Sequence, residues 1–168
     1  DLARDLEAVL DRPADLVTAA AFFDLVAPDW LAHFCAALLE RRLPLLAVLT
    51  YDGLERWTPP HAADAEVLAA FHAHQMSDKG FGPSAGPGAF ALLAQAFRSA
   101  GWLVTQGASP WALTAPDEAP LIAALAEGAA GAVAETGRVG PADLASWLEA
   151  RRVAQGCQIG HMDIFAAP

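Results

Sequence analysis

Basic side chains are scarce in this sequence. Its 168 residues include 10 Lys and Arg against 20 Asp and Glu, which gives a formal net charge of −10. The only adjacent basic pairs are Arg41–Arg42 and Arg151–Arg152. Because a duplex-binding protein needs a positively charged surface, nucleic acid is not an expected partner.

Long apolar runs are missing as well. The longest candidate, residues 43–49, has the length of a strand and contains Pro44. A membrane-spanning helix needs about 20 consecutive apolar residues, so no membrane association is expected. The first residues do not have the pattern of a secretory signal, and the cytoplasm is the expected compartment.

Cysteine is also rare, with Cys35 and Cys157 far apart in the sequence. Free cysteine is among the most buried residue types, so we expect two buried thiols. A disulfide is the alternative, and it belongs to oxidising compartments.

Apolar residues, by contrast, make up 55% of the chain, and charged residues make up 18%. A chain of this length buries roughly 70% of its unfolded surface when it folds, so it can form a proper core. We therefore expect one α/β domain over residues 1–168.

Helical and strand-like patterns alternate along the chain. The spacing of apolar residues predicts helices at 1–10, 28–42, 62–75, 89–100, 120–135 and 141–154, and strands at 15–21, 43–51, 102–105, 111–114 and 157–166. Loops are expected at 54–60 and 77–88. Alternation of this kind predicts a mostly parallel sheet, with an antiparallel edge formed by the late strands. The continuously apolar strand 43–51 should be covered on both faces.

The start of the chain is unusual. It begins at Asp1 without methionine and enters a helical pattern directly. Strand 15–21 also lacks an upstream neighbour. We therefore expect the chain to be the later part of a larger α/β domain, and its unpaired strand edge predicts a homodimer.

The segment Asp15-Leu-Val-Thr-Ala-Ala-Ala-Phe-Phe-Asp-Leu-Val precedes a helix that contains Trp30. It resembles the fourth-strand motif of class I S-adenosylmethionine-dependent methyltransferases. Strand 43–51 then resembles the fifth strand of that family, and the loop 74–83 resembles the segment that closes over the substrate. The resemblance implies a partial Rossmann-like methyltransferase fold, made of the later strands and their antiparallel edge.

The resemblance implies S-adenosyl-L-methionine as cofactor. In this family, the acid at the position of Asp1 accepts a hydrogen bond from the adenine, and the amide of its neighbour, here Leu2, meets the ring. Thr18, Ala19 and Ala20 end a strand at the carboxyl edge, where open α/β sheets bind ligands. The alternatives are a frayed terminus for Asp1 and plain helix–sheet packing for 18–20.

The glycine-rich first-strand motif of the family is absent from this sequence, as is the acidic residue that binds the ribose. The glycines Gly80 and Gly82 do not replace that motif, because they follow a helix and have prolines nearby. We therefore expect these 168 residues to bind the cofactor weakly or not at all.

Methyl transfer is an in-line displacement that depends mainly on orientation and on the exclusion of water. The expected acceptor is a small molecule. Some acceptors also need a base, and the candidate catalytic residues are Tyr51, His74 and Asp78. The candidate substrate-binding residues are Phe22, Trp57, His61, Lys79 and Phe81. A structural or solvated role is the alternative for each, and no metal site is expected.

Two other functions remain open from the sequence. One is a non-catalytic, methyltransferase-like subunit or interaction domain. The other is a different nucleotide-binding α/β enzyme.

Overall fold

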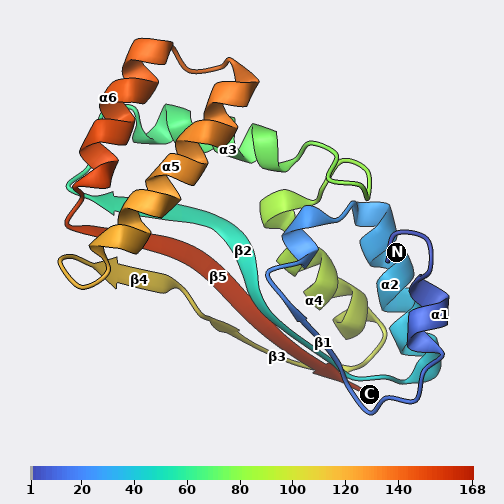
Figure 1. Ribbon diagram of the computed structural model, residues 1–168. Helices are drawn as coiled ribbons and strands as arrows, with labels where there is room; N and C mark the ends of the chain where they lie inside the picture. The colour runs from blue at the N-terminus through green and yellow to red at the C-terminus, as the bar shows by residue number, and fades with distance from the viewer. Residues whose placement is uncertain (1) are drawn as a thin grey trace. The chain divides into compact units, whose positions relative to one another are not determined.

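The computed structural model describes residues 2–168, so the predicted role of Asp1 lies outside the described residues. Over this range the protein is an α/β structure with six α-helices and a five-stranded sheet (Figure 1). The helices are α1 (Leu6–Leu10), α2 (Pro28–Arg41), α3 (Asp64–Gln75), α4 (Ala89–Ser99), α5 (Ala119–Thr136) and α6 (Pro141–Arg152). The strands are β1 (Val17–Ala20), β2 (Leu45–Thr58), β3 (Leu103–Ala108), β4 (Trp111–Thr114) and β5 (Gly156–Ala167). Two short 3-10 helices, η1 (Phe23–Leu25) and η2 (Gly86–Gly88), complete it.

The chain forms two compact units. The first unit consists of residues 1–52, 76–109 and 161–168, and the second consists of residues 53–75 and 110–160. Strands β2 and β5 each contribute residues to both units.

The sheet of the first unit is mixed, and its strand order is β1-β2-β5-β3. Strand β1 pairs in parallel with β2, from Val17 opposite Leu45 to Ala20 opposite Val48. Strand β3 pairs antiparallel to β5. The predicted combination of a parallel start and an antiparallel edge is therefore confirmed.

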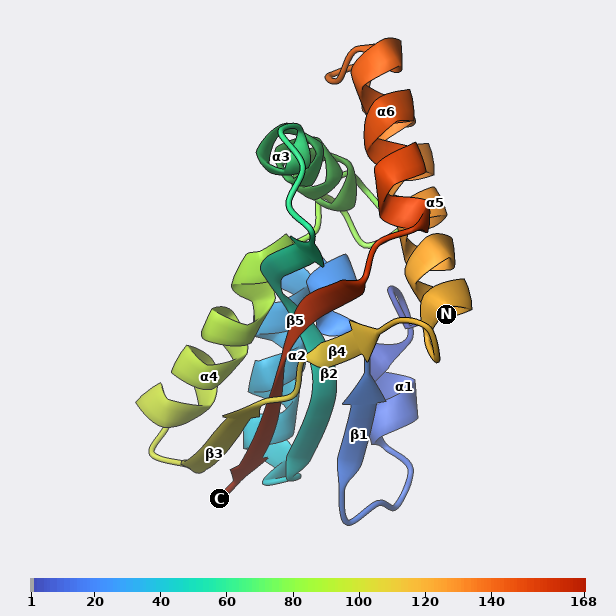
Figure 2. The same ribbon diagram turned by 90° about the vertical axis from the view of Figure 1, so that its left-hand side faces the viewer.

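Helices α1, α2 and α4 build the core of the first unit on one face of its sheet. Leu45 and Ala47 of β2 and Ile164 and Ala166 of β5 are buried in the same cluster as residues of these helices. Figure 2 shows α2 and α4 behind the strands. Residues of the opposite face are less covered: Leu46 and Val48 of β2 are only half-buried, and Phe165 of β5 is 39% exposed. The expected cover on both faces of strand 43–51 is therefore not found within residues 2–168.

Strand β2 is longer than the sequence predicts. It continues through Gly53 to Thr58, so the predicted strand end at Asp52–Gly53 and the predicted loop at 54–60 are wrong. Gly53 has a φ of 89° inside the strand. A glycine in a strand often marks an irregularity in the pleat, and here that irregularity is followed by more strand.

The second unit packs α3, α5 and α6 with β4 and the adjoining parts of β2 and β5. Its core includes Trp57, Val67, Ile122, Val133 and Trp147. Strand β4 pairs antiparallel to β5, with Trp111 opposite Ile159.

Arg151 lies within the second unit with only 1% of its surface exposed. Its Nη1 donates to the carbonyl of Pro59 at 2.6 Å, and its Nε lies 3.3 Å from Oδ1 of Asp64. The same carboxylate oxygen accepts the indole N–H of Trp147 at 2.8 Å. This buried polar cluster ties the start of α3 to the end of α6.

Both cysteines are free and buried, as the sequence predicts. Burial raises the pKa of the Cys35 thiol to about 12, and that of Cys157 also to about 12.

Candidate functional site

A pocket of about 350 Å³ lies beside β1 in the first unit. Its lining includes Leu2, Thr18, Ala19, Ala20, Phe22 and Trp30. The structure therefore brings together four of the residues predicted to bind the cofactor and one predicted to bind the substrate. The volume lies within the range of small-molecule sites, roughly 300–1,000 Å³.

The pocket borders the open edge of β1, which has β2 as its only partner among residues 2–168. The N–H of Val17 donates to the carbonyl of Pro44 at 2.9 Å, and the N–H of Ala21 donates to Val48 at 3.1 Å. Alternate residues of a parallel strand face the same neighbour. The backbone amides and carbonyls of Thr18 and Ala20 therefore face away from β2, where a ligand can reach them.

Three aromatic rings meet at the carboxyl end of β1. The ring centroids of Phe22, Trp30 and Phe81 lie 5.6 Å (Phe22–Trp30), 5.7 Å (Phe22–Phe81) and 5.3 Å (Trp30–Phe81) apart in edge-on arrangements. The indole N–H of Trp30 also donates to the carbonyl of Leu2 at 3.2 Å. The sequence did not single out Trp30 as a site residue, because its helical spacing fits a core position equally well.

The loop that supplies Phe81 is shaped by Asp78. Its Oδ1 accepts the N–H groups of Gly80 at 2.7 Å and of Gly82 at 2.9 Å. The two glycines have φ values of 98° and 83°, a conformation that other residues rarely adopt. The structure thus gives Asp78, a predicted catalytic residue, a role in holding the loop, while Lys79 is exposed on it.

Polar residues are buried just after β1 and around the middle of β2. Asp24 follows β1 and is 7% exposed, and Thr50 and Tyr51 on β2 are 0% and 6% exposed. The Thr50 hydroxyl has no hydrogen-bond partner within the described part of the chain. The ring of Tyr51 lies 6.3 Å from that of His161, which is 8% exposed. Of these four, the sequence indicated only Tyr51, although a polar residue inside an apolar strand is a usable signal for Thr50 and His161.

Three predicted site residues belong to the second unit. His74 bonds Glu135 at 3.0 Å, and the backbone N–H of His61 donates to Asp64 at 2.8 Å where α3 begins. Trp57 is buried, donates its indole N–H to Glu55 at 2.7 Å and packs edge-on against Trp147. The structure gives each of the three a contact that stabilises the second unit.

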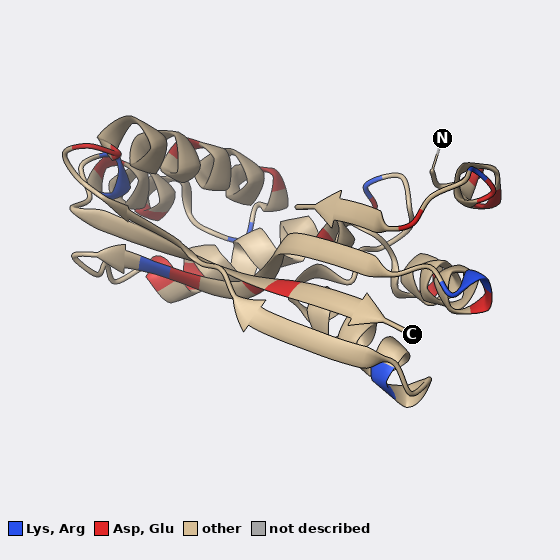
Figure 3. Ribbon diagram, turned by 90° about the horizontal axis from the view of Figure 1, so that it is seen from below, with Lys and Arg blue, Asp and Glu red and all other residues tan. Residues whose placement is uncertain are grey.

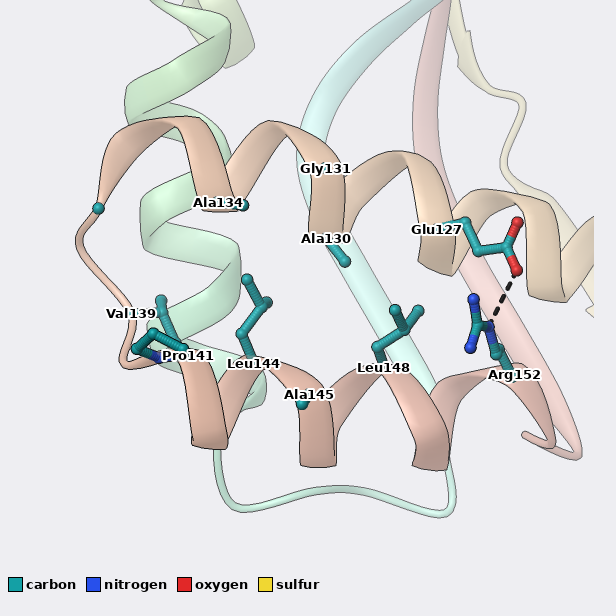
Figure 4. A pocket seen from close by; sticks show the side chains of 11 residues that line it. Glu127, Ala130, Gly131, Ala134, Val139, Pro141, Leu144, Ala145, Leu148 and Arg152 are labelled. Atoms are coloured by element: carbon teal, nitrogen blue, oxygen red, sulfur yellow. Dashed lines mark hydrogen bonds and ion pairs between the residues drawn. The ribbon is translucent and has the colours of Figure 1, made fainter.

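The second unit also has an apolar groove of about 670 Å³ between α5 and α6 (Figure 4). Small residues such as Ala130 and Ala134 line it on α5, and Leu144 and Leu148 line it on α6. Among its lining residues, only Glu127 and Arg152 are charged, and they pair with each other at 2.9 Å. The groove therefore presents no unpaired charge or nucleophile to a ligand.

Within residues 2–168, no group of three or more His, Cys, Asp or Glu side chains is arranged to hold a metal ion. The same part of the chain contains no helix of the length and apolarity that crossing a membrane requires.

A comparison with protein-family models finds no match to this chain, and a comparison with curated proteins finds none either.

Proposed function

We propose that this protein carries out S-adenosylmethionine-dependent methyl transfer to a small-molecule acceptor, on a Rossmann-like methyltransferase fold of the class I type. The observation that carries the proposal is the pocket beside β1. Leu2 and Thr18–Ala20, named from the family resemblance alone, line one cavity together. The antiparallel edge formed by β3, β4 and β5 also supports the proposed fold.

The residues of this pocket suit the chemical groups of the cofactor. Leu2, Leu6 and Val9 give an apolar wall for an adenine ring. The outward backbone groups of Thr18 and Ala20 can bond polar atoms beside it. The aromatic rings of Phe22 and Trp30 can stabilise a positive sulfur centre by cation–π attraction, roughly 0.5–2 kcal/mol.

When bound, the cofactor supplies a methyl group on a positively charged sulfur. The protein's own residues then have two tasks: to orient the acceptor and to exclude water. Phe81, on the loop held by Asp78, lies against Phe22 and is placed to cover the reacting groups. Tyr51, once it has lost its own phenolic proton, is our candidate for the group that accepts a proton from an acceptor that must lose one.

Titration of the ¹⁵N-labelled protein with S-adenosylhomocysteine, followed by ¹H–¹⁵N NMR, tests the proposal. This method detects weak binding, which we expect because the sequence lacks the glycine-rich motif. The amides of Leu2 and Thr18–Ala20 should shift, while those of α5 and α6 should stay in place. Shifts confined to α5 and α6, or no shift at saturating probe, would favour the alternative of a non-catalytic interaction domain.

A matched pair of variants assigns the response to the pocket. Ala20→Phe places a large side chain at the exposed end of β1 and should abolish the shifts. Ala36→Phe adds the same side chain at an exposed position of α2, outside the pocket, and should leave them unchanged. Equal responses from the two variants would contradict binding beside β1. Separately, tight binding of S-adenosylmethionine in isothermal titration would contradict the expectation that the absence of the glycine-rich motif weakens cofactor binding.

A further inference from the structure

Asp163 is the only Asp, Glu, Lys or Arg in the sequence of β5. The strands of this sheet carry few charged side chains, as Figure 3 shows. The Oδ1 atom of Asp163 accepts two hydrogen bonds, from the backbone N–H of Leu49 at 2.8 Å and from the Ser109 hydroxyl at 2.5 Å. Ser109 is fixed in turn, because its N–H donates to the carbonyl of His161 at 2.9 Å. A carboxylate inside the sheet therefore holds two segments that are distant in sequence.

The Leu49 backbone that Asp163 holds is in a left-handed conformation, with a φ of 56°. This conformation is unfavourable for a residue with a side chain, so the surroundings of Leu49 must stabilise it. The turn occurs where the pairing with β1 ends, because Ala20 opposite Val48 is the last pair. The residue that follows β1, Ala21, has a φ of 49°.

The turn at Leu49 changes which side chains of β2 are buried. Before it, buried Leu45 and Ala47 alternate with half-buried neighbours. After it, Thr50 and Tyr51 are buried in succession. A regular strand alternates its side chains, so the turn sets the direction of Tyr51. On β5, His161 and Asp163 are two residues apart and point to the same face: His161 meets the Tyr51 ring and Asp163 holds the turn.

We infer that Asp163, with Ser109, is a positioning residue for Tyr51. It fixes the turn at Leu49 and thereby directs the Tyr51 phenol. That this direction serves methyl transfer rests on the proposed function, whereas the positioning itself does not. Asp163 acts through the backbone of Leu49.

Tyr51 is the only tyrosine in the sequence, so it can be observed directly. Protein grown with 3-fluorotyrosine should give one ¹⁹F NMR resonance. Asp163→Ala removes both hydrogen bonds and should shift or broaden this resonance. Asp163→Asn keeps an acceptor oxygen and should restore a resonance close to that of the wild type. Asp15→Ala is the matched control, because it removes an exposed carboxylate of the same unit and should leave the resonance in place.

An unmoved resonance in a folded Asp163→Ala protein, as judged by circular dichroism, overturns the inference. Should that variant fail to fold, Ser109→Ala decides, because it removes one bond to Asp163 and must still move the resonance. Titration with S-adenosylhomocysteine separates the two proposals. A resonance that depends on Asp163, with no response of any amide to the probe, supports positioning and contradicts the proposed function. Amide shifts at Thr18–Ala20, together with a ¹⁹F resonance that Asp163→Ala leaves unchanged, support the proposed function and contradict positioning.

Discussion

Thr50 illustrates how one atom can distinguish a packing position from a binding position. Its side chain is 0% exposed and its hydroxyl is unbonded within residues 2–168, next to Tyr51. Buried polar atoms in proteins are nearly always bonded to protein, water or ligand, so an exception requires an explanation. The stability of a variant without this hydroxyl tests whether the group is bonded in the folded state.

Thr50→Val removes the hydroxyl and keeps the shape of the side chain. Because an unsatisfied buried polar group costs about 1–3 kcal/mol, the variant should be more stable by about 1 kcal/mol in urea denaturation. Thr105→Val, at an exposed position of β3, should change stability by less than about 0.5 kcal/mol. A destabilised Thr50→Val protein would mean that the hydroxyl is bonded in the folded state.

The two thiols should be unreactive in the folded protein. The thiolate is the reactive form, and burial raises the pKa of both Cys35 and Cys157 to about 12. Ellman's reagent near pH 8 should therefore detect no thiol in the native protein and both thiols in denaturant. Rapid labelling of either cysteine without denaturant would contradict the burial described above.

At the scale of elements, Asp64 and Arg151 hold α3 and α6 together. Removing the carboxylate leaves the Arg151 charge buried without its partner, and such losses cost about 3–5 kcal/mol. Asp64 is 28% exposed, so we expect Asp64→Ala to lose about 3 kcal/mol of unfolding free energy, at the lower end of that range. Glu149→Ala, on an exposed position of α6, is the control and should change little. Equal stabilities of the two variants would mean that the cluster does not stabilise the second unit.

Glu55, on the last part of β2, should make stability depend on pH. Burial raises its pKa above the ordinary value of 4.5, although the hydrogen bond from Trp57 acts in the opposite direction. The folded state therefore binds the proton of Glu55 more tightly than the unfolded state does. The stability that the folded state gains from this bound proton is lost as pH rises through the interval above 4.5.

Glu55→Gln removes that titration and keeps an oxygen for the Trp57 indole. The variant should gain stability relative to wild type as pH increases from 4.5 toward neutral, as measured by urea denaturation at a series of pH values. Parallel pH profiles for the two proteins would contradict the raised pKa of Glu55.

Helices were more predictable than the ends of strands, for a physical reason. The limits of α2 follow from local signals, because Pro28 suits a first helical position and Arg41 suits the last turn. The extension of β2 beyond Gly53 and the turn at Leu49 depend on β5, more than a hundred residues later. Leu49 is bonded by Asp163, and no local pattern around Leu49 contains that information.

The same distinction applies to the candidate site. Thr18–Ala20 could be named from a strand motif because they are consecutive at the end of one strand, whereas Leu2 was named from the family resemblance as the neighbour of Asp1. Trp30 and Asp163 were missed because their hydrogen-bond partners are distant in sequence. Thr50 was missed although a polar residue in an apolar strand is a local signal. For His61 and His74, residue type suggested chemistry, whereas their observed partners, Asp64 and Glu135, indicate structural contacts.

At the scale of the whole molecule, the edge of β1 has no strand partner within residues 2–168, and apolar side chains lie near it, such as Leu16, which is 41% exposed. Unpaired edges of this kind favour association of chains. We therefore predict that the ligand-free protein is a homodimer by light scattering, formed through β1, and that a cofactor bound to the same outward groups of Thr18 and Ala20 competes with this dimer. Thr18→Pro should give a monomer, because the N–H that it removes faces away from β2. Thr18→Ala should remain dimeric, and a wild-type monomer at all concentrations would contradict the prediction.

The division of the first unit into three chain segments has a consequence for synthesis. Residues 161–168 form the part of β5 that lies between β2 and β3 in the strand order. During translation, β1, β2 and the helices packed on them are made long before this segment, and β3 has no partner until it arrives. Domains generally fold as units during synthesis, but the sheet of the first unit cannot be completed until this last segment has been made. It must wait, with its apolar strands exposed, for residues 161–168 to leave the ribosome, so the nascent chain should depend on chaperones during that interval.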